Sequence, residues 1–384
     1  MNKNIFEGAA TLIGTIIGAG ILGIPFVVMK AGFLTSLITL VGIGLILMLT
    51  NLAMGEIVLR TKGKHQLTGY SSIYLGSWGK GLMTFSMVFG IYGALLAYLI
   101  GEGQVLSQLF GGGEILWSII FLIAGSLFIL GGVEYLKKSE FWLTSIELII
   151  FLGILIALFS SKQFSVSNLT EFSWTKILVP YGVVLFAYLG TSCIPAIKEE
   201  MKNNLKNYKK AILLGSIIPI FVYILFAFAV VAVTGAQTTQ IATIGVGKIL
   251  GSFAVVIFNL FAFLAMTTSF ISLGFALKEM FIYDFKFNKH LSWLFVISIP
   301  IIVFFIGVQN FTKTLETTGA ISGGVAGILI GLMYFKVQKL GNRKPEYKMN
   351  YPSWLIWIAI IIFFLGAGLE LGINEWLPKI YKLL

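Results

Sequence analysis

Charged residues are scarce in this sequence, and their scarcity excludes an ordinary soluble protein. Only 11% of the 384 residues are charged, whereas 58% are hydrophobic. An average soluble domain is about 25% charged and roughly 45–50% apolar. Apolar runs long enough to cross a bilayer core of about 30 Å recur along the whole chain. We therefore expect an all-α, multi-pass integral membrane protein surrounded by lipid.

Cysteine and histidine are nearly absent. The single Cys193 excludes a disulfide within the chain, and both histidines, His65 and His290, fall in polar loops. Zinc-type sites need clusters of these residues, so no resident metal and no other cofactor are expected. The net charge of +11 could suggest a nucleic-acid partner. Basic residues also collect in the cytoplasmic loops of membrane proteins, which explains the charge without nucleic acid.

The apolar runs predict eleven spans and leave no room for a separate soluble domain. With the N-terminus inside, the inner loops hold 20 of the 27 basic residues. The positive-inside rule therefore predicts a cytoplasmic N-terminus and an external C-terminus. The expected spans are about 6–31, 34–59, 80–109, 114–133, 141–160, 174–197, 209–234, 249–277, 291–309, 317–337 and 354–374.

The first span contains GTIIGAGILGIP, from Gly14 to Pro25, with four glycines and a proline. Glycine costs roughly 1 kcal/mol in a helix interior and proline about 3 kcal/mol. The sixth span reads LFAYLGTSCIPAIKEE, from Leu185 to Glu200. A shift of 170 residues places its glycine and its isoleucine–proline pair on those of the first span. Both spans are therefore expected to be interrupted.

The second interrupted span comes five spans after the first, and because five is odd, the second copy is inverted in the membrane. Interruptions at matching positions of two halves point to the binding site of an inverted-repeat transporter. The sequence predicts a single transport domain over 1–384. Within it, 1–170 and 171–340 are the two five-helix repeats, and 341–384 adds one further span.

A broken helix frees backbone groups at membrane depth, where they must line a cavity or be buried. The N-terminal end of a half-helix suits a carboxylate, and unwound carbonyls suit a cation. Gly18–Gly20 and Leu189–Ser192 could provide both a helix N-terminus for a carboxylate and free carbonyls for an ammonium, as an amino acid zwitterion requires. The alternative is close helix packing, because Gly14 and Gly18 also have small-xxx-small spacing.

Three successive hydroxyl residues, Thr267, Thr268 and Ser269, interrupt the apolar eighth span. Hydroxyl and carbonyl oxygens are hard ligands that suit small, hard cations. The alternative is that these hydroxyls bond back to the preceding turn of their own helix.

Three stretches resemble known transporters: GTIIGAGILGIPFVVMKAGF, FAYLGTSCIPAIKEEMKN and AMTTSF. They resemble the amino acid/auxin permease family and the bacterial aromatic permeases of the tryptophan/tyrosine type, both in the amino acid–polyamine–organocation superfamily. The resemblance covers nearly the whole chain. It implies the LeuT fold, with two inverted five-helix repeats, discontinuous first and sixth spans, and a site between spans one, three, six, eight and ten. It also implies a prokaryotic plasma membrane.

The resemblance implies that the substrate carboxylate meets amides of the first span and the Tyr98 hydroxyl, and that its ammonium meets carbonyls of both broken spans. An apolar pocket could include Phe186, Tyr188 and Phe270. The implied substrate-binding residues are Thr15, Ile16, Gly18, Ala19, Gly20, Tyr98, Ala187, Tyr188, Gly190, Thr191 and Phe270.

In such folds a sodium ion lies between carbonyls of the first span and an A-x-x-[ST]-[ST] pattern on the eighth. The resemblance assigns carbonyls of Gly14 and Ile17 and the pattern residues Ala265, Thr268 and Ser269. Some proton-coupled relatives place a lysine of the fifth span there, and span 141–160 has none. Sodium coupling is therefore expected. The alternatives are proton coupling and exchange.

Four glutamates fall within spans, where ionisable residues are functional candidates. Glu56 could brace the sixth span or lie at the interface near Arg60. Glu102 could carry a coupling proton or lie in the outer vestibule. Glu147 is expected near the inner surface, beside Lys137 and Lys138, and Glu370 has no expected role.

No carboxylate falls in the motif segments, so a cationic substrate would lack a partner. We expect a neutral amino acid, with aromatic and branched side chains as candidates, moved by alternating access. An enzyme would need a polar cluster that the sequence lacks, and a channel would more often show charged rings or pore loops. A transporter-like nutrient sensor is the third alternative. The sequence predicts neither the exact substrate nor the oligomeric state.

Overall fold

The computed structural model describes residues 3–131, 134–283 and 285–372, with the side chains of 3–4 and 134–145 left out. Lys137 and Lys138 thus lie outside the described side chains. The described part is helical throughout, without strands. Its α-helices are α1 (Lys3–Ile16), α2 (Ile24–Ala31), α3 (Phe33–Arg60), α4 (Leu67–Phe110), α5 (Glu114–Gly131), α6 (Glu134–Phe159), α7 (Tyr181–Ala187), α8 (Ile194–Glu200), α9 (Tyr208–Thr234), α10 (Ala242–Leu250), α11 (Ser252–Tyr283), α12 (Lys289–Phe305), α13 (Phe311–Thr318), α14 (Gly324–Leu340) and α15 (Trp354–Glu370).

These helices account for the expected spans. Seven helical stretches are long and apolar enough to cross a membrane, and the bent pair α1 and α2 makes an eighth. Three shorter apolar helices, Ile146–Phe159, α12 and α15, correspond to the fifth, ninth and eleventh expected spans. Helices satisfy their own backbone hydrogen bonds, which is what a lipid environment demands.

Two span boundaries differ from the expectation. Helix α4 begins at Leu67, well before the expected start near residue 80, because Gly76 joins two helical pieces. Its φ of +78° is a conformation that only glycine adopts readily. The sixth span begins at Tyr181, not near 174, because Trp174–Lys176 forms a separate 3₁₀ turn.

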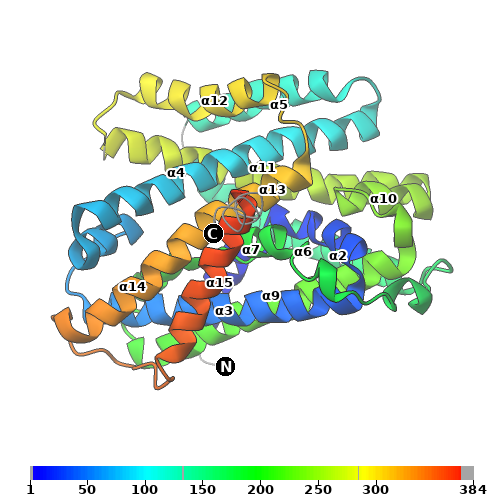
Figure 1. Ribbon diagram of the computed structural model, residues 1–384. Helices are drawn as coiled ribbons and strands as arrows, with labels where there is room; N and C mark the ends of the chain where they lie inside the picture. Colours follow the sequence, from blue (N-terminus) through cyan, green and yellow to red (C-terminus); the bar gives the residue numbers. More distant parts are fainter. Residues whose placement is uncertain (1–2, 132–133, 284, 373–384) are drawn as a thin grey trace, which may run out of the picture.

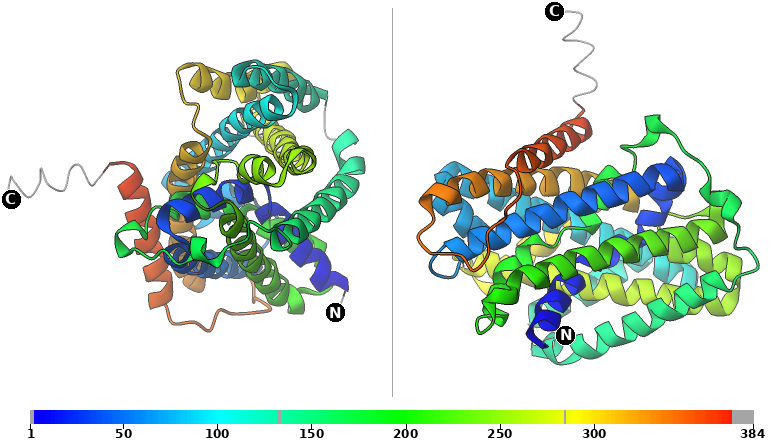
Figure 2. Two further views of the ribbon diagram at one scale, coloured as in Figure 1. Left: turned by 90° about the vertical axis from the view of Figure 1, so that its right-hand side faces the viewer. Right: turned by 90° about the horizontal axis from the view of Figure 1, so that it is seen from below.

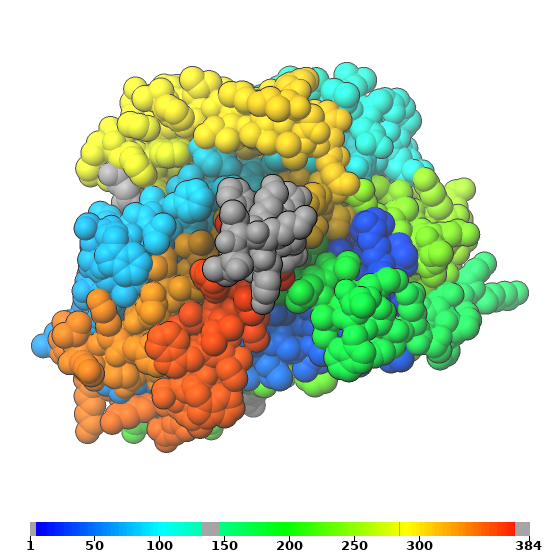
Figure 3. Space-filling view, in the orientation of Figure 1, coloured from blue at the N-terminus to red at the C-terminus, as the bar shows by residue number. Residues whose placement is uncertain are grey.

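The helices pack as pairs that join distant parts of the chain. Helix α3 packs on α9, and α4 packs on α11. Figure 1 shows α5 and α12 together at one edge, and the right view of Figure 2 shows α3 between α9 and α14. On the face shown in Figure 3, α15 (red) lies on the surface beside α14 (orange), on which it packs.

Large apolar side chains cover the outside of this bundle. Phe221 of α9, Ile149 of α6 and Phe128 of α5 are 68%, 70% and 58% exposed. Such surfaces would aggregate in water and mark contact with a membrane. Among the described residues, the acidic and basic side chains buried inside the bundle are Glu56, Glu102 and Lys278, and each is a candidate for structure or function.

The first broken span is α1 and α2, which meet at a bend of 50°. A short 3₁₀ helix, η1 (Ala19–Leu22), leads into α2, and Gly18 precedes it in an extended conformation. The second break follows the same plan. Helix α7 ends at Ala187, the 3₁₀ turn η4 (Thr191–Cys193) follows, and α8 begins with Ile194 and Pro195. Both expected interruptions are confirmed.

Candidate substrate and ion site

The first break presents unpaired backbone amides inside the bundle. The first amides of any helix lack an intrahelical partner. Here they belong to Ala19 and Gly20, which open η1 and are buried. The N-terminal end of a helical piece carries positive partial charge. The break can therefore receive a carboxylate, as expected from the sequence.

The two breaks touch each other through their backbones. A Cβ atom built on Gly20 would lie 2.9 Å from Cα of Ala187, at the end of α7. A Cβ atom on Gly190 would lie 2.5 Å from the side chain of Ile16, at the end of α1. The glycines thus allow a close approach that any larger residue would prevent. The structure brings the expected residues of the first and sixth spans together.

Tyr223 of α9 links the C-terminal ends of the two half-helices. Its hydroxyl lies 2.6 Å from the carbonyl oxygen of Ile16 and 2.9 Å from that of Ala187. The side chain is fully buried. A phenol has one hydrogen to donate, so it satisfies only one of these carbonyls at a time. Both carbonyls belong to the set expected to hold the substrate ammonium. The sequence analysis missed Tyr223.

Asn51 of α3 holds the second break in place. Its side-chain oxygen accepts a hydrogen bond of 2.9 Å from the Thr191 hydroxyl, and its amide donates to Ser216 of α9 at 3.2 Å. Asn51 is 1% exposed. Thr191 was expected to contact the substrate, but its hydroxyl instead donates to Asn51 and attaches the second break to α3. An asparagine inside an apolar helix was the available signal for this residue.

The three hydroxyls of α11 have partners on two helices, α4 and α6. Thr267 donates to Glu102 of α4 at 2.9 Å, and Thr268 lies 3.3 Å from Glu147 of α6. Ser269 meets Tyr98 of α4 and lies beside Gly18, where an added Cβ would approach its oxygen to 3.4 Å. Thr268 also bonds back to the Leu264 carbonyl at 2.9 Å.

Some of the expected cation ligands thus lie near one another, namely those on α11. Ser269 faces the first break, and Thr268 follows the pattern residue Ala265, whose carbonyl it contacts at 3.3 Å. Gly14 lies in the last turn of α1, and Ile17 follows the end of that helix, directly before Gly18. Gly14 is exposed and an added Cβ there would meet no atom within 4 Å, so its surroundings are open.

Thr15 turns its hydroxyl onto its own helix, donating to the Thr11 carbonyl at 2.8 Å. The Thr15 side chain also makes a hydrogen-bond contact with Cys193 of η4, so it joins the end of α1 to the second break.

Glu102 is buried deep in the bundle. It is 0% exposed, and within the described residues its second carboxylate oxygen has no hydrogen-bond partner. Tyr98 lies one turn earlier on α4 and is also buried. In this structure α11 covers Glu102 through Thr267, so the carboxylate does not face an open vestibule.

Glu147 was expected near the inner surface, and this expectation is wrong. Its contact with Thr268, in the middle of α11, places it at the depth of the hydroxyl triplet. A span-by-span estimate of depth cannot detect such a contact, because it depends on how α6 packs on α11.

Of the aromatic residues expected to line the substrate pocket, Phe270 lies away from the breaks, whereas Tyr188 packs beside them. Phe270 packs on α5, with its ring 5.0 Å from that of Phe121 and against Gly125. One residue turns a helix by about 100°, so Phe270 cannot share the face of Ser269. The Tyr188 ring lies 4.9 Å from the Tyr223 ring at an angle of 42°, and its hydroxyl is buried without a partner among the described residues.

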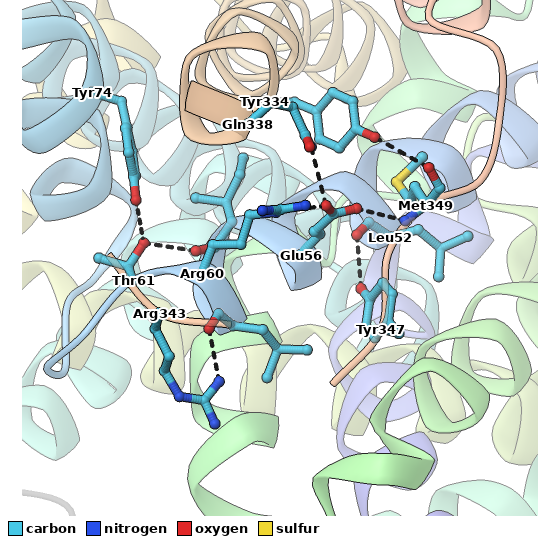
Figure 4. A network of polar contacts seen from close by, with 12 residues as sticks. Leu52, Glu56, Arg60, Thr61, Tyr74, Tyr334, Gln338, Arg343, Tyr347 and Met349 are labelled. Carbon is cyan, nitrogen blue, oxygen red and sulfur yellow. Dashed lines mark hydrogen bonds and ion pairs between the residues drawn. The ribbon is translucent and has the colours of Figure 1, made fainter. Parts of the chain in front are cut away.

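Glu56 does not brace the broken sixth span. Figure 4 shows it instead in a network with Arg60, Gln338 of α14 and the backbone of Met349. The Glu56 oxygens lie 2.7 Å from Arg60, 3.0 Å from Gln338 and 2.6 Å from the Met349 nitrogen. The carboxylate therefore joins α3 to α14 and to the segment that precedes α15. The bracing role belongs to Asn51.

Glu370 also has a structural partner set. It pairs with Lys313 of α13 at 2.9 Å and accepts a hydrogen bond from Thr317. These contacts fasten the end of α15 to the tenth span, outside the two breaks.

Comparison with known proteins agrees with this geometry. Tyrosine-specific transport system 1 of Haemophilus influenzae is 26% identical over 294 residues, 73% of each chain. Glutamine transporter 2 of Aliivibrio fischeri is 24% identical over 343 residues, covering 84% of this chain and 86% of that one. The low affinity tryptophan permease of Proteus vulgaris is 23% identical over 243 residues, 58% of this chain and 56% of that one.

Two solved structures share the fold. The inward facing conformation of Mhp1 has a TM-score of 0.67 at 13% identity, covering 97% of this chain and 91% of that one. MhsT in complex with L-phenylalanine has a TM-score of 0.62 at 15% identity, covering 96% and 98%. The LeuT fold expected from the sequence is confirmed.

Residues 1–369 match the tryptophan/tyrosine permease family over almost the whole chain. Of the two families that the sequence resembled, the match is to the bacterial aromatic permeases. The protein is a transporter and not an enzyme, and its apolar helices make it a multi-pass protein of the plasma membrane. This chain belongs to the tryptophan/tyrosine permease family.

Proposed function

We propose that this permease moves a neutral amino acid by alternating access, together with sodium. The substrate carboxylate binds the amides of Ala19 and Gly20, and the ammonium binds carbonyls of Ile16 and Ala187. Sodium binds beside them, between α1 and the Thr268–Ser269 pair of α11.

The observation that carries this proposal is the meeting of the two breaks. Amides at the start of η1 lie next to the carbonyl ends of α1 and α7, and the Tyr223 hydroxyl contacts one carbonyl at each of these ends. An amino acid zwitterion can place its carboxylate on the amides and its ammonium on the carbonyls. A ligand with only one of these two groups would leave the other set of backbone groups without a partner.

A neutral substrate is supported by the charges around the breaks. The two nearby carboxylates, Glu102 and Glu147, are each engaged with a hydroxyl of α11. The named relatives are described as transporters of tyrosine, glutamine and tryptophan, all neutral amino acids.

A proton is the second candidate for the coupling ion. Glu102 supports it, because one oxygen of this buried carboxylate lacks a partner among the described residues. A protonated carboxyl could donate from that oxygen. In that case the hydroxyls of α11 would serve packing and helix bonding.

Uptake by the purified protein in liposomes tests the proposal. A labelled panel of neutral amino acids would be offered under an inward sodium gradient alone, and then under an inward proton gradient alone. Accumulation that follows sodium supports the site at Thr268 and Ser269. Accumulation that follows only protons would instead support Glu102 as the group that carries the coupling ion. Accumulation under neither gradient would favour exchange.

A further inference from the structure

The side chain of Glu147 comes from the fifth span to the hydroxyl triplet of α11. Thr268 Oγ1 lies 3.3 Å from Glu147 Oε1, 2.9 Å from the Leu264 carbonyl and 3.3 Å from the Ala265 carbonyl. One hydroxyl hydrogen thus faces three acceptor oxygens. At most one or two of these contacts can be hydrogen bonds, which leaves oxygen lone pairs directed at one another.

A cation between these oxygens would resolve the excess of lone pairs. Ca²⁺, which resembles sodium in size, binds oxygens at about 2.3–2.6 Å, so ligands at right angles lie about 3.3–3.7 Å apart. The Thr268–Glu147 separation of 3.3 Å has this value. The Ser269 hydroxyl, on the neighbouring residue, faces the first break at Gly18.

The charge of Glu147 has no other compensation in the described part of the chain. No lysine or arginine there lies within ion-pair distance of it, whereas Glu56, Glu171, Glu199, Glu316, Glu346 and Glu370 each have such a partner. A carboxylate at membrane depth is expensive and normally has a functional partner.

We propose that Glu147 is the anionic ligand of the cation site at Thr268 and Ser269. This inference rests on the sodium site of the proposed function and adds a charge to its otherwise neutral set of carbonyl and hydroxyl ligands. One carboxylate makes the occupied site neutral for a monovalent cation, whereas a divalent cation would leave a net positive charge in a low-dielectric interior. The site therefore selects sodium over calcium or magnesium.

Glu102 provides a matched control. It is also a carboxylate beside a hydroxyl of α11, but its partner Thr267 donates a single, well-placed hydrogen bond of 2.9 Å. Thr267 is not part of the proposed site. Glu102→Gln therefore changes another carboxyl group that contacts α11 without touching the proposed sodium ligands.

The test measures cation binding without transport. Purified wild-type protein, Glu147→Gln, Glu147→Asp and Glu102→Gln would be titrated with sodium chloride at constant ionic strength and constant pH, with choline chloride as the balancing salt. Thermal unfolding reports binding, because a ligand of the native state raises the melting temperature. Tracer uptake at the same sodium concentrations would follow in liposomes.

We expect Glu147→Gln to raise the half-saturating sodium concentration about tenfold or more, which corresponds to about 1.4 kcal/mol of binding free energy. Glu147→Asp should recover part of this loss, and Glu102→Gln should bind sodium as the wild type does. If Glu147→Gln does not fold, the half-saturating sodium concentration of Glu147→Asp is the test. This variant keeps the carboxylate but has a shorter side chain, so it should still bind sodium more weakly than the wild type.

Wild-type sodium affinity in both Glu147 variants would overturn the proposal while leaving the sodium site intact. A wild-type protein that ignores sodium in both measurements would overturn the sodium site, and this inference with it. An equal loss in Glu102→Gln would show a general effect of buried charge and would also overturn the specific role of Glu147.

Discussion

The two helix breaks share a sequence plan but differ in what surrounds them. In the first, the residues from Gly18 to Gly20 have no side-chain cap, and their amides open a helical piece. In the second, side chains from other helices hold the chain: Asn51 binds Thr191, and Tyr208 binds the Ile194 carbonyl at 2.5 Å.

This difference suggests a division of labour. A backbone that binds ligand must keep its polar groups free, whereas the backbone opposite it must be held at a fixed position. The first break fits the former requirement and the second fits the latter. Tyr223 stands between them, since it contacts one carbonyl of each. We call the approach of Gly20 to Ala187 the contact, the Asn51–Thr191 hydrogen bond the frame, and Tyr223 the link. Substitutions at these three places should differ in their effects on transport.

The largest effect is expected at the contact between the breaks. Gly20→Leu places a side chain where even a Cβ atom would lie 2.9 Å from the Ala187 backbone. Uptake should fall about a hundredfold or more, as a roughly 1 Å misplacement can cause at a reacting site. Gly42→Ala on α3 is the control, because its Cβ would meet nothing within 4 Å. Normal uptake by an inserted Gly20→Leu protein would refute the role of the first break.

A smaller effect is expected in the frame of the second break. Thr191→Val keeps the shape but leaves the buried Asn51 oxygen without its donor, a loss of about 1–3 kcal/mol. Initial uptake rate and melting temperature should both decrease, with uptake down about tenfold. The control is Thr243→Val, whose buried hydroxyl has no partner among the described residues. If both variants transport equally well, the frame is not needed.

A still smaller effect is expected at the link. Tyr223→Phe removes one hydrogen bond worth about 0.5–1.5 kcal/mol, so KM for the amino acid should change about twofold to tenfold. Tyr92→Phe loses a similar phenol–carbonyl bond, to Phe295, away from the breaks and should leave KM unaltered. Equal KM values for all three proteins would show that Tyr223 only packs.

The smallest effect on transport is expected at Phe270. Phe270→Leu should lower the free energy of unfolding by about 1 kcal/mol, through lost packing on Phe121, and change KM less than about twofold. A large shift in substrate preference measured by competition uptake would instead return Phe270 to the substrate pocket.

The breaks could be predicted from the sequence because glycine and proline act locally. Their repetition after 170 residues, with Ile24–Pro25 and Ile194–Pro195 at the start of each second half, needed no knowledge of packing. The LeuT fold followed from the same motifs. The eleven apolar spans followed from composition and length alone.

The residues around the breaks could not be predicted in the same way. Asn51, Tyr223 and Glu147 are single polar side chains in apolar helices, with no spacing pattern that reveals a partner. Their roles depend on which helix faces which, as in the packing of α3 on α9 and α6 on α11. For the same reason the sequence left open whether Glu56 braces the sixth span or lies near Arg60, where the structure places it, and it put Phe270 on the wrong face.

The network at Glu56 also has a consequence for the order in which the protein assembles. Met349, whose backbone binds Glu56, lies 293 residues later in the chain. At about 5–20 residues per second, the ribosome adds it roughly 15–60 s after Glu56. During that interval Arg60, four residues away, is already present as a counter-ion. The order of synthesis thus gives the Glu56 carboxylate a counter-ion long before its later partners, Gln338 and Met349, are added.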